Sequence, residues 1–270
     1  MEASQFNTDA YSPKEVEQRI ERVGVTKARL GLVELIALGV LAGAFIGFGA
    51  LYYTIVASDP DLSFALSRML GGLVFSLGLI LVVVAGAELF TGNNLMVMAW
   101  VSGRVSTRLL LRNLVVVYVA NFAGAAGLAL LVYLSGHLSM NGGEVGAKAV
   151  AIAQAKADLD LTEAFFRGVL CNVLVCLAVW LAAAARSVAG KVLAILFPIS
   201  AFVAAGFEHC VANMYFLPLG MLAAPDTAPV PIDALWTNLV PVTLGNIVGG
   251  AGLVGLVYWL VYHRNRETGS

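Results

Sequence analysis

Two glutamates, Glu88 and Glu208, each stand alone in the middle of a long uncharged stretch. Their surroundings repeat, with AGAELFTGN at 85–93 and AGFEHCVAN at 205–213. An ionisable group at membrane depth is costly and is usually received by a polar pathway. We therefore expect the repeated motif to mark the functional site.

His209 and Thr91 are the residues of this motif that could move a proton. Imidazole can take up or release a proton near neutral pH, and the Thr91 hydroxyl could donate to an anion or to His209. A histidine in an apolar segment is more often a satisfied core residue. Here the depth, the helix break and the repeat favour a functional role for His209.

The charged groups in and near the motif can also be explained without a direct role in function. A carboxylate at a helix break can accept the freed backbone N–H groups, so we interpret Glu88 and Glu208 as scaffolding. Lys156 lies near Asp158 and Asp160 and alone would be an ordinary solvated charge.

Composition places these residues in a membrane protein. Hydrophobic residues make up 60% of the chain and charged residues 12%, against about 25% charged in soluble domains. Uncharged runs cover 35–58, 113–143, 168–185 and 234–263, each long enough for one crossing helix. Two further stretches, 69–103 and 192–225, are too long for one helix and too short for two. We therefore expect broken second and fifth helices, the first with a turn at 91–94 that faces the protein interior.

Six crossings put both termini on one side of the membrane. Twelve of the sixteen Lys and Arg residues fall on that side, which predicts that both termini are cytoplasmic. Ser12 and Pro13 suit the start of a helix. We expect an amphipathic cytoplasmic helix within 1–29, a channel domain at 30–263 and a cytoplasmic tail at 264–270. No cleaved signal peptide is predicted.

The two halves of the chain are related. The segment 113–124 shares Asn-Leu-Val and a later Asn and Gly with 238–249, and 39–41 matches 168–170. A duplicated three-span unit enters the membrane in opposite senses and places its site between the broken helices. The sequence thus predicts an all-α polytopic protein with inverted repeats at about 30–135 and 161–263.

Four segments resemble the signatures of the formate/nitrite transporter family: ELFTGN at 88–93, CNVLVCLAVW at 171–180, GFEHCVANM at 206–214 and PVTLGNIVGG at 241–250. The resemblance spans nearly the whole chain and is strongest to bacterial formate channels. It implies an aquaporin-like bundle in the bacterial inner membrane. It also implies a homopentamer with one pore per protomer for small monovalent anions.

The resemblance assigns further site residues. It places Thr91 and His209 at the pore centre with Asn213 and Asn246 nearby, and Lys156 and Asn172 at the outer vestibule. It also implies hydrophobic constrictions, which exclude hydrated ions, formed by Phe75, Leu79, Leu89, Phe90 and Phe202. Glycine-rich faces, such as Gly39, Gly43, Gly47 and Gly245, Gly249, Gly250, allow the close helix approach that pentamers use.

We expect a channel or transporter for formate, with nitrite, hydrosulfide or a short monocarboxylate as alternatives. An ion crossing a dry constriction costs many kcal/mol, which its neutral acid avoids, so we expect His209 to protonate the anion. The three cysteines, Cys171, Cys176 and Cys210, are read as packing residues. No enzyme activity, metal, cofactor or nucleic-acid partner is expected.

Overall fold

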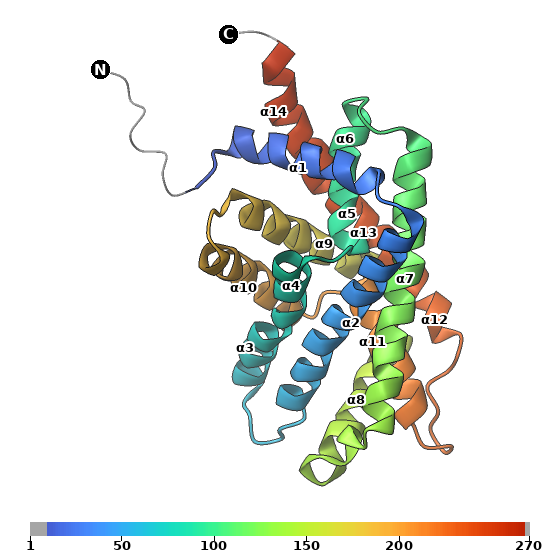
Figure 1. Ribbon diagram of the computed structural model, residues 1–270. Coiled ribbons are helices and arrows are strands. Elements are labelled where there is room, and N and C mark those ends of the chain that lie inside the picture. The colour runs from blue at the N-terminus through green and yellow to red at the C-terminus, as the bar shows by residue number, and fades with distance from the viewer. Residues whose placement is uncertain (1–9, 268–270) are drawn as a thin grey trace.

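The computed structural model describes residues 10–267, and side chains as far as 262. This part of the chain is α-helical apart from one β-bridge (Figure 1). Within it, six segments are long and apolar enough to cross a membrane, which confirms the expected fold class. They are α2 (Leu32–Ala57), Phe64–Gly86, α7 (Thr107–Leu134), α9 (Leu161–Ala184), α10 (Val188–Ala205) and Ala234–Tyr262.

Two crossings consist of several helical pieces. Phe64–Gly86 contains α3 (Phe64–Phe75), α4 (Leu77–Leu81) and a π-helical turn (Val82–Gly86). The last crossing contains α12 (Ala234–Thr237), α13 (Leu239–Ile247), a π-helical stretch (Val248–Leu256) and α14 (Val257–Glu267). A π-helical turn carries an extra residue and shifts the helix face.

The helices begin and end at points that differ from the uncharged runs. Both α7 and α9 start about two turns earlier than expected, because charged residues in their first turns can reach the polar boundary. The chain leaves α7 after Leu134, where Gly136 has a φ of 74°. Short turns then lead into α8 (Glu144–Ala157), a helix that the sequence analysis did not predict.

The second and fifth crossings are broken, each after a glycine with positive φ. Gly86 (φ 90°) precedes non-helical residues 87–89, and Gly206 (φ 74°) precedes non-helical residues 207–209. The chain resumes as α5 (Phe90–Asn93), a 3-10 turn (Asn94–Met96) and α6 (Val97–Val101), or as α11 (Cys210–Ala223). The expected turn at 91–94 is therefore wrong. The break comes earlier, because glycine alone adopts positive φ without strain.

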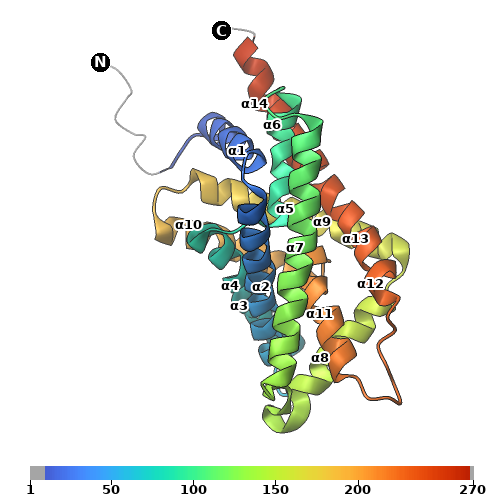
Figure 2. The same ribbon diagram turned by 45° about the vertical axis from the view of Figure 1, so that its right-hand side comes forward.

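Glycines bring crossing helices into contact within the protomer. A Cβ on Gly124 of α7 would overlap the Val40 carbonyl of α2, and one on Gly249 would overlap the Val169 carbonyl of α9. Figure 2 shows α2 and α7 running side by side. The glycine faces are thus occupied by neighbouring helices of the same chain, so the close approach that they allow occurs within the protomer.

The first helix, α1 (Pro13–Ala28), lies across the end of the bundle near α14 (Figure 1). Ser12 and Glu15 form a capping box, and these hydrogen bonds from Ser12 hold the pKa of the Glu15 carboxyl below its ordinary value. The Tyr11 ring lies between the guanidinium groups of Arg19 and Arg186, 4.0 and 4.4 Å from its centroid. Together these contacts attach α1 to the end of α9.

Both α1 and the end of α14 lie at one end of the bundle. The last helix runs to Glu267, so most of the expected tail at 264–270 continues α14. The remainder of that tail, 268–270, and residues 1–9 of the expected N-terminal region lie outside the described residues.

Candidate functional site

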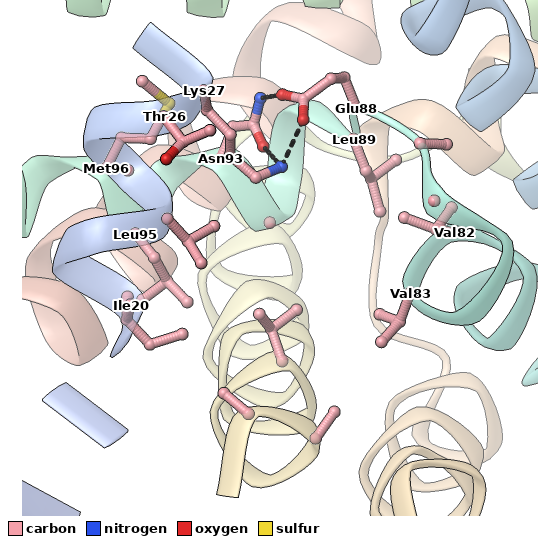
Figure 3. A pocket seen from close by; sticks show the side chains of 18 of the residues that line it. Ile20, Thr26, Lys27, Val82, Val83, Glu88, Leu89, Asn93, Leu95 and Met96 are labelled. Atoms are coloured by element: carbon pink, nitrogen blue, oxygen red, sulfur yellow. Dashed lines mark hydrogen bonds and ion pairs between the residues drawn. The ribbon is translucent and has the colours of Figure 1, made fainter. Parts of the chain in front are cut away.

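A polar network lines a cavity of about 710 Å³ beside α1, which we call the inner cavity (Figure 3). Lys27 Nζ donates to Glu88 Oε1 at 2.7 Å and to Asn93 Oδ1 at 2.8 Å. Asn93 Nδ2 donates to Glu88 Oε2 at 2.7 Å and to Asn113 Oδ1 at 2.8 Å. Asn113 Nδ2 donates to the Lys27 carbonyl at 3.1 Å. This ring of bonds ties the broken second crossing to α1 and α7.

A matching network lies beside α8, at a cavity of about 190 Å³ that we call the outer cavity. Lys156 Nζ donates to the two oxygens of Glu208 at 2.8 and 3.0 Å. Asn213 Nδ2 donates to Glu208 Oε2 at 2.6 Å and to Asn238 Oδ1 at 2.7 Å, and Asn238 Nδ2 donates to the Lys156 carbonyl at 3.0 Å. The two halves of the chain thus build the same ring. One difference is that Asn213 Oδ1 is buried without a hydrogen-bond partner.

Asn121 of α7 holds the first break in place. Its Oδ1 accepts from the Phe90 amide at 2.9 Å, and its Nδ2 donates to the carbonyls of Glu88 at 2.9 Å and Gly39 at 2.8 Å. An amide side chain suits this position because it both accepts and donates. We expected the carboxylate to accept the freed N–H, and that detail is wrong. The Glu88 carboxylate is instead occupied by Lys27 and Asn93.

Asn246 of α13 does the same at the second break. Its Oδ1 accepts from the Cys210 amide at 3.0 Å, and its Nδ2 donates to the carbonyls of Glu208 at 3.0 Å and Gly168 at 2.7 Å. The side chain lines neither cavity. In this structure Asn246 therefore contacts the backbone of the pore loop and not the open space.

Asn172 also lies between helices. Its Nδ2 donates to the Asn246 carbonyl at 2.6 Å and to the Thr91 carbonyl at 3.3 Å. It is fully buried and lines neither cavity. The Asn172 side chain of α9 is thus bonded to the backbone of α5 and α13 and faces neither cavity.

His209 and Thr91 come from opposite breaks and meet. The Thr91 Oγ1 and His209 Nε2 atoms are 2.9 Å apart. The Ala212 amide donates to His209 Nδ1 at 3.0 Å, so the imidazole caps α11. Since Nδ1 accepts, the neutral ring carries its hydrogen on Nε2 and donates it to Thr91. A charged imidazolium would need a hydrogen on Nδ1 and would lose the bond from Ala212.

The five predicted constriction residues are all buried, but they occupy different places. Leu79 and Leu89 line the inner cavity, and Phe75 and Phe202 line the outer cavity. The Phe202 ring stacks on His209 with centroids 5.9 Å apart and meets Phe75 edge-on at 5.6 Å. Phe90 lines neither cavity.

Several residues of the site were not assigned from sequence. Lys27 was counted only as a cytoplasmic charge, and Asn121 only as a repeated residue. The repeat was the available signal, because Asn121 matches Asn246 and Asn113 matches Asn238 in the aligned segments. No comparable signal pointed to Lys27, whose contact with the first break depends on the path of α1.

Comparison with known proteins finds relatives that match nearly the whole chain. A family model described as "Formate/nitrite transporter" matches residues 14–260. The formate channel FocA of Haemophilus influenzae is 37% identical over 272 residues, covering 94% of this chain and 96% of that protein. A probable formate transporter of Methanothermobacter thermautotrophicus is 41% identical over 268 residues, covering 93% and 97%.

A solved structure described as a pentameric formate channel with formate bound superposes with a TM-score of 0.80. It is 40% identical, and the match covers 86% of this chain and 98% of that one. The family model and these relatives match nearly the whole chain. The chain therefore belongs to the formate/nitrite transporter family.

Proposed function

We propose that this protein is a formate channel, with nitrite, hydrosulfide or a short monocarboxylate as alternative substrates. Two observations outside the chain support formate. Relatives similar over more than 90% of the chain are named as formate channels or transporters, and a similar structure contains bound formate. Within the chain, the contact between His209 and Thr91 carries the proposal.

This contact supports proton transfer because of its surroundings. His209 is 3% exposed and Thr91 is fully buried, and aromatic or leucine side chains lie toward both cavities. A small anion gains few hydrogen bonds among such groups, so its passage as an ion is costly. Its neutral acid avoids most of that cost. A proton donor at the narrowest region therefore lowers the barrier.

The hydrogen bonds of His209 define the steps. Protonation at Nδ1 converts the ring to imidazolium and breaks the bond from the Ala212 amide. The imidazolium then gives the Nε2 proton to an oxygen of the anion, which leaves as the neutral acid. A shift of the remaining proton back to Nε2 restores the bond from Ala212. The cap, worth about 0.5–1.5 kcal/mol as a net hydrogen bond, favours the neutral ring with its hydrogen on Nε2 over the imidazolium and over the other neutral tautomer.

The two lysine networks flank this centre. Lys156 and Asn213 line the outer cavity together with His209, and Lys27 and Asn93 line the inner one. An ammonium group beside each cavity offers an arriving anion a hydrogen-bond donor. Asn213 Oδ1, which has no partner, can accept the hydroxyl of the neutral acid. Asn246 and Asn172 take part by holding the pore loops.

We further propose a homopentamer in the bacterial cytoplasmic membrane with both termini inside. The pentameric relative supports the assembly, and the excess of Lys and Arg at the α1 end supports the orientation. Tags at the N-terminus and after Arg266 should be reachable only from the cytoplasm. A tag at Gly142 should be reachable from outside, and termini on opposite faces would exclude the six-crossing arrangement.

The proton mechanism is tested with His209→Asn. Asparagine is a good N-cap, so the variant keeps a group that accepts from the Ala212 amide but cannot cycle a proton. We expect it to fold and to conduct some anion, while losing pH-dependent flux and the accompanying proton movement. Thr91→Val, the matched control, should lower flux and keep the pH dependence, since the titrating group remains.

Anion and proton flux are measured together in liposomes between about pH 5 and 8, where histidine titrates. Formate, nitrite, hydrosulfide, lactate and chloride are compared to identify the substrate. Unchanged pH dependence in His209→Asn would place protonation elsewhere. A wild-type protein that carries nitrite or hydrosulfide and excludes formate would reject the substrate and leave the fold assignment intact.

A further inference from the structure

Three cationic side chains line the outer cavity: Lys156, Arg167 and Arg68. Two of them are paired with carboxylates. Lys156 contacts Glu208 at 2.8 Å, and Arg167 Nη2 contacts Glu163 at 2.8 Å. None of the salt bridges in the described part of the chain involves Arg68.

Arg68 lies in the second turn of α3 and is held by weak contacts. Its Nη1 donates to the Tyr53 hydroxyl at 3.4 Å, near the limit for a hydrogen bond. Its guanidinium carbon lies 5.6 Å from the centroid of the Phe64 ring. A Cβ built on Gly206 would lie 3.4 Å from Arg68 Nη2. The guanidinium group therefore reaches the backbone of the second break, just before His209.

Arg68 differs from Lys156 in having no carboxylate partner among the salt bridges of the described residues. The Lys156 ammonium and the Glu208 carboxylate nearly cancel at a distance, because opposite charges in contact act as a dipole. The Arg68 charge is not compensated in this way, so its field extends from the cavity mouth. Most of its five donors have no acceptor among the contacts of the described residues.

We propose that Arg68 captures the permeant anion at the outer mouth and selects anions with two oxygens. This inference rests on the proposed anion transport. The planar guanidinium group presents two parallel N–H bonds that match a carboxylate, and lysine lacks this fork. Formate and nitrite can each accept both bonds, whereas hydrosulfide and chloride accept from one point. Arg68 is thus a specificity residue for this channel.

The test compares Arg68→Gln and Arg68→Lys with a double variant, Glu163→Gln with Arg167→Gln, which removes a contacting pair of opposite charges together. Initial uptake of formate is measured below saturation in liposomes whose protein orientation is known. Arg68→Gln should lower uptake roughly three- to tenfold at 0.01 M salt, where the Debye length is about 30 Å, and less than about twofold at 1 M. The double variant should change uptake little, because it leaves the net charge unchanged.

Arg68→Lys keeps the positive charge at this position and removes the planar guanidinium group. It should keep the salt dependence of wild-type uptake but reduce the preference for formate over hydrosulfide, because it lacks the fork. Equal loss in Arg68→Gln at both salt concentrations, or an effect no larger than in the double variant, would overturn the capture role. A preference unchanged in Arg68→Lys would overturn the selectivity role.

Failure of the proposed substrate gives a different result. If the wild-type protein does not carry formate, the same variants are measured with nitrite, which also presents two oxygens. A salt-dependent loss of nitrite uptake in Arg68→Gln would support the role of Arg68 without formate. The absence of that loss would reject it.

Discussion

Replacing Asn121 with leucine tests whether the pore loop is held by a side chain from α7. Leucine has nearly the same shape and removes three hydrogen bonds. The Phe90 amide and the Glu88 carbonyl then lose their partners in a buried place. Each such group costs about 1–3 kcal/mol. The Gly39 carbonyl adds less, because it lies inside α2 and also accepts an intrahelical bond.

We therefore expect Asn121→Leu to lower the free energy of unfolding by about 2–6 kcal/mol. Thermal unfolding in detergent, followed by intrinsic fluorescence, measures the loss, and amide hydrogen exchange at 87–93 locates it. The control is Val119→Leu on the exposed face of the same helix, where the side chain is 63% exposed. An unfolding midpoint and an exchange rate equal to those of this control would refute the anchoring role.

Two further changes probe helix contacts and the buried ion pair. Gly124→Ala should lower the unfolding midpoint by placing a methyl group on the α2 backbone, whereas Gly127→Ala, with open space at its Cβ, should leave it equal or slightly higher. Glu208→Gln should destabilise by about 3–5 kcal/mol because it leaves the Lys156 ammonium, 13% exposed, without its partner. The double change with Lys156→Gln should recover part of this loss in a double-mutant cycle, and strict additivity would argue against the pair.

The broken crossings could be predicted from the sequence because a lone charge in an apolar segment needs polar partners inside the protein. It placed the first break wrongly, because Thr91 to Asn94 are common turn formers. Thr91 to Asn93 instead lie in α5, and Asn94 begins the 3-10 turn that follows it. The positive φ that ends the second crossing is at Gly86. The conformation is decided by Asn121, which bonds the loop from another helix. Local preference carries no information about that partner.

Two other contacts depend on the folded path of the chain in the same way. Glycine spacing predicts that a helix face allows close approach, and here neighbouring helices of the same chain occupy it. Lys156 lies in α8, which brings it to Glu208, 52 positions along the chain. A sequence pattern shows that a face or a charge requires a partner. The identity of the partner depends on the folded path of the chain.

The differences between the two repeats point to the centre of the site. The duplicated motif keeps its glutamate and asparagine, and in both copies the glutamate binds a lysine and accepts a hydrogen bond from the asparagine. It changes at five positions, and at two of them a polar side chain in one copy faces an apolar one in the other: Leu89 corresponds to His209, and Thr91 corresponds to Val211. The two polar members of these pairs contact each other at 2.9 Å. Symmetry is therefore kept where the loops need support and lost where one proton donor faces one hydroxyl. In the proposed mechanism one donor is enough to protonate the anion, and a second imidazole in place of Leu89 would add another charge beside His209 whenever both rings were protonated.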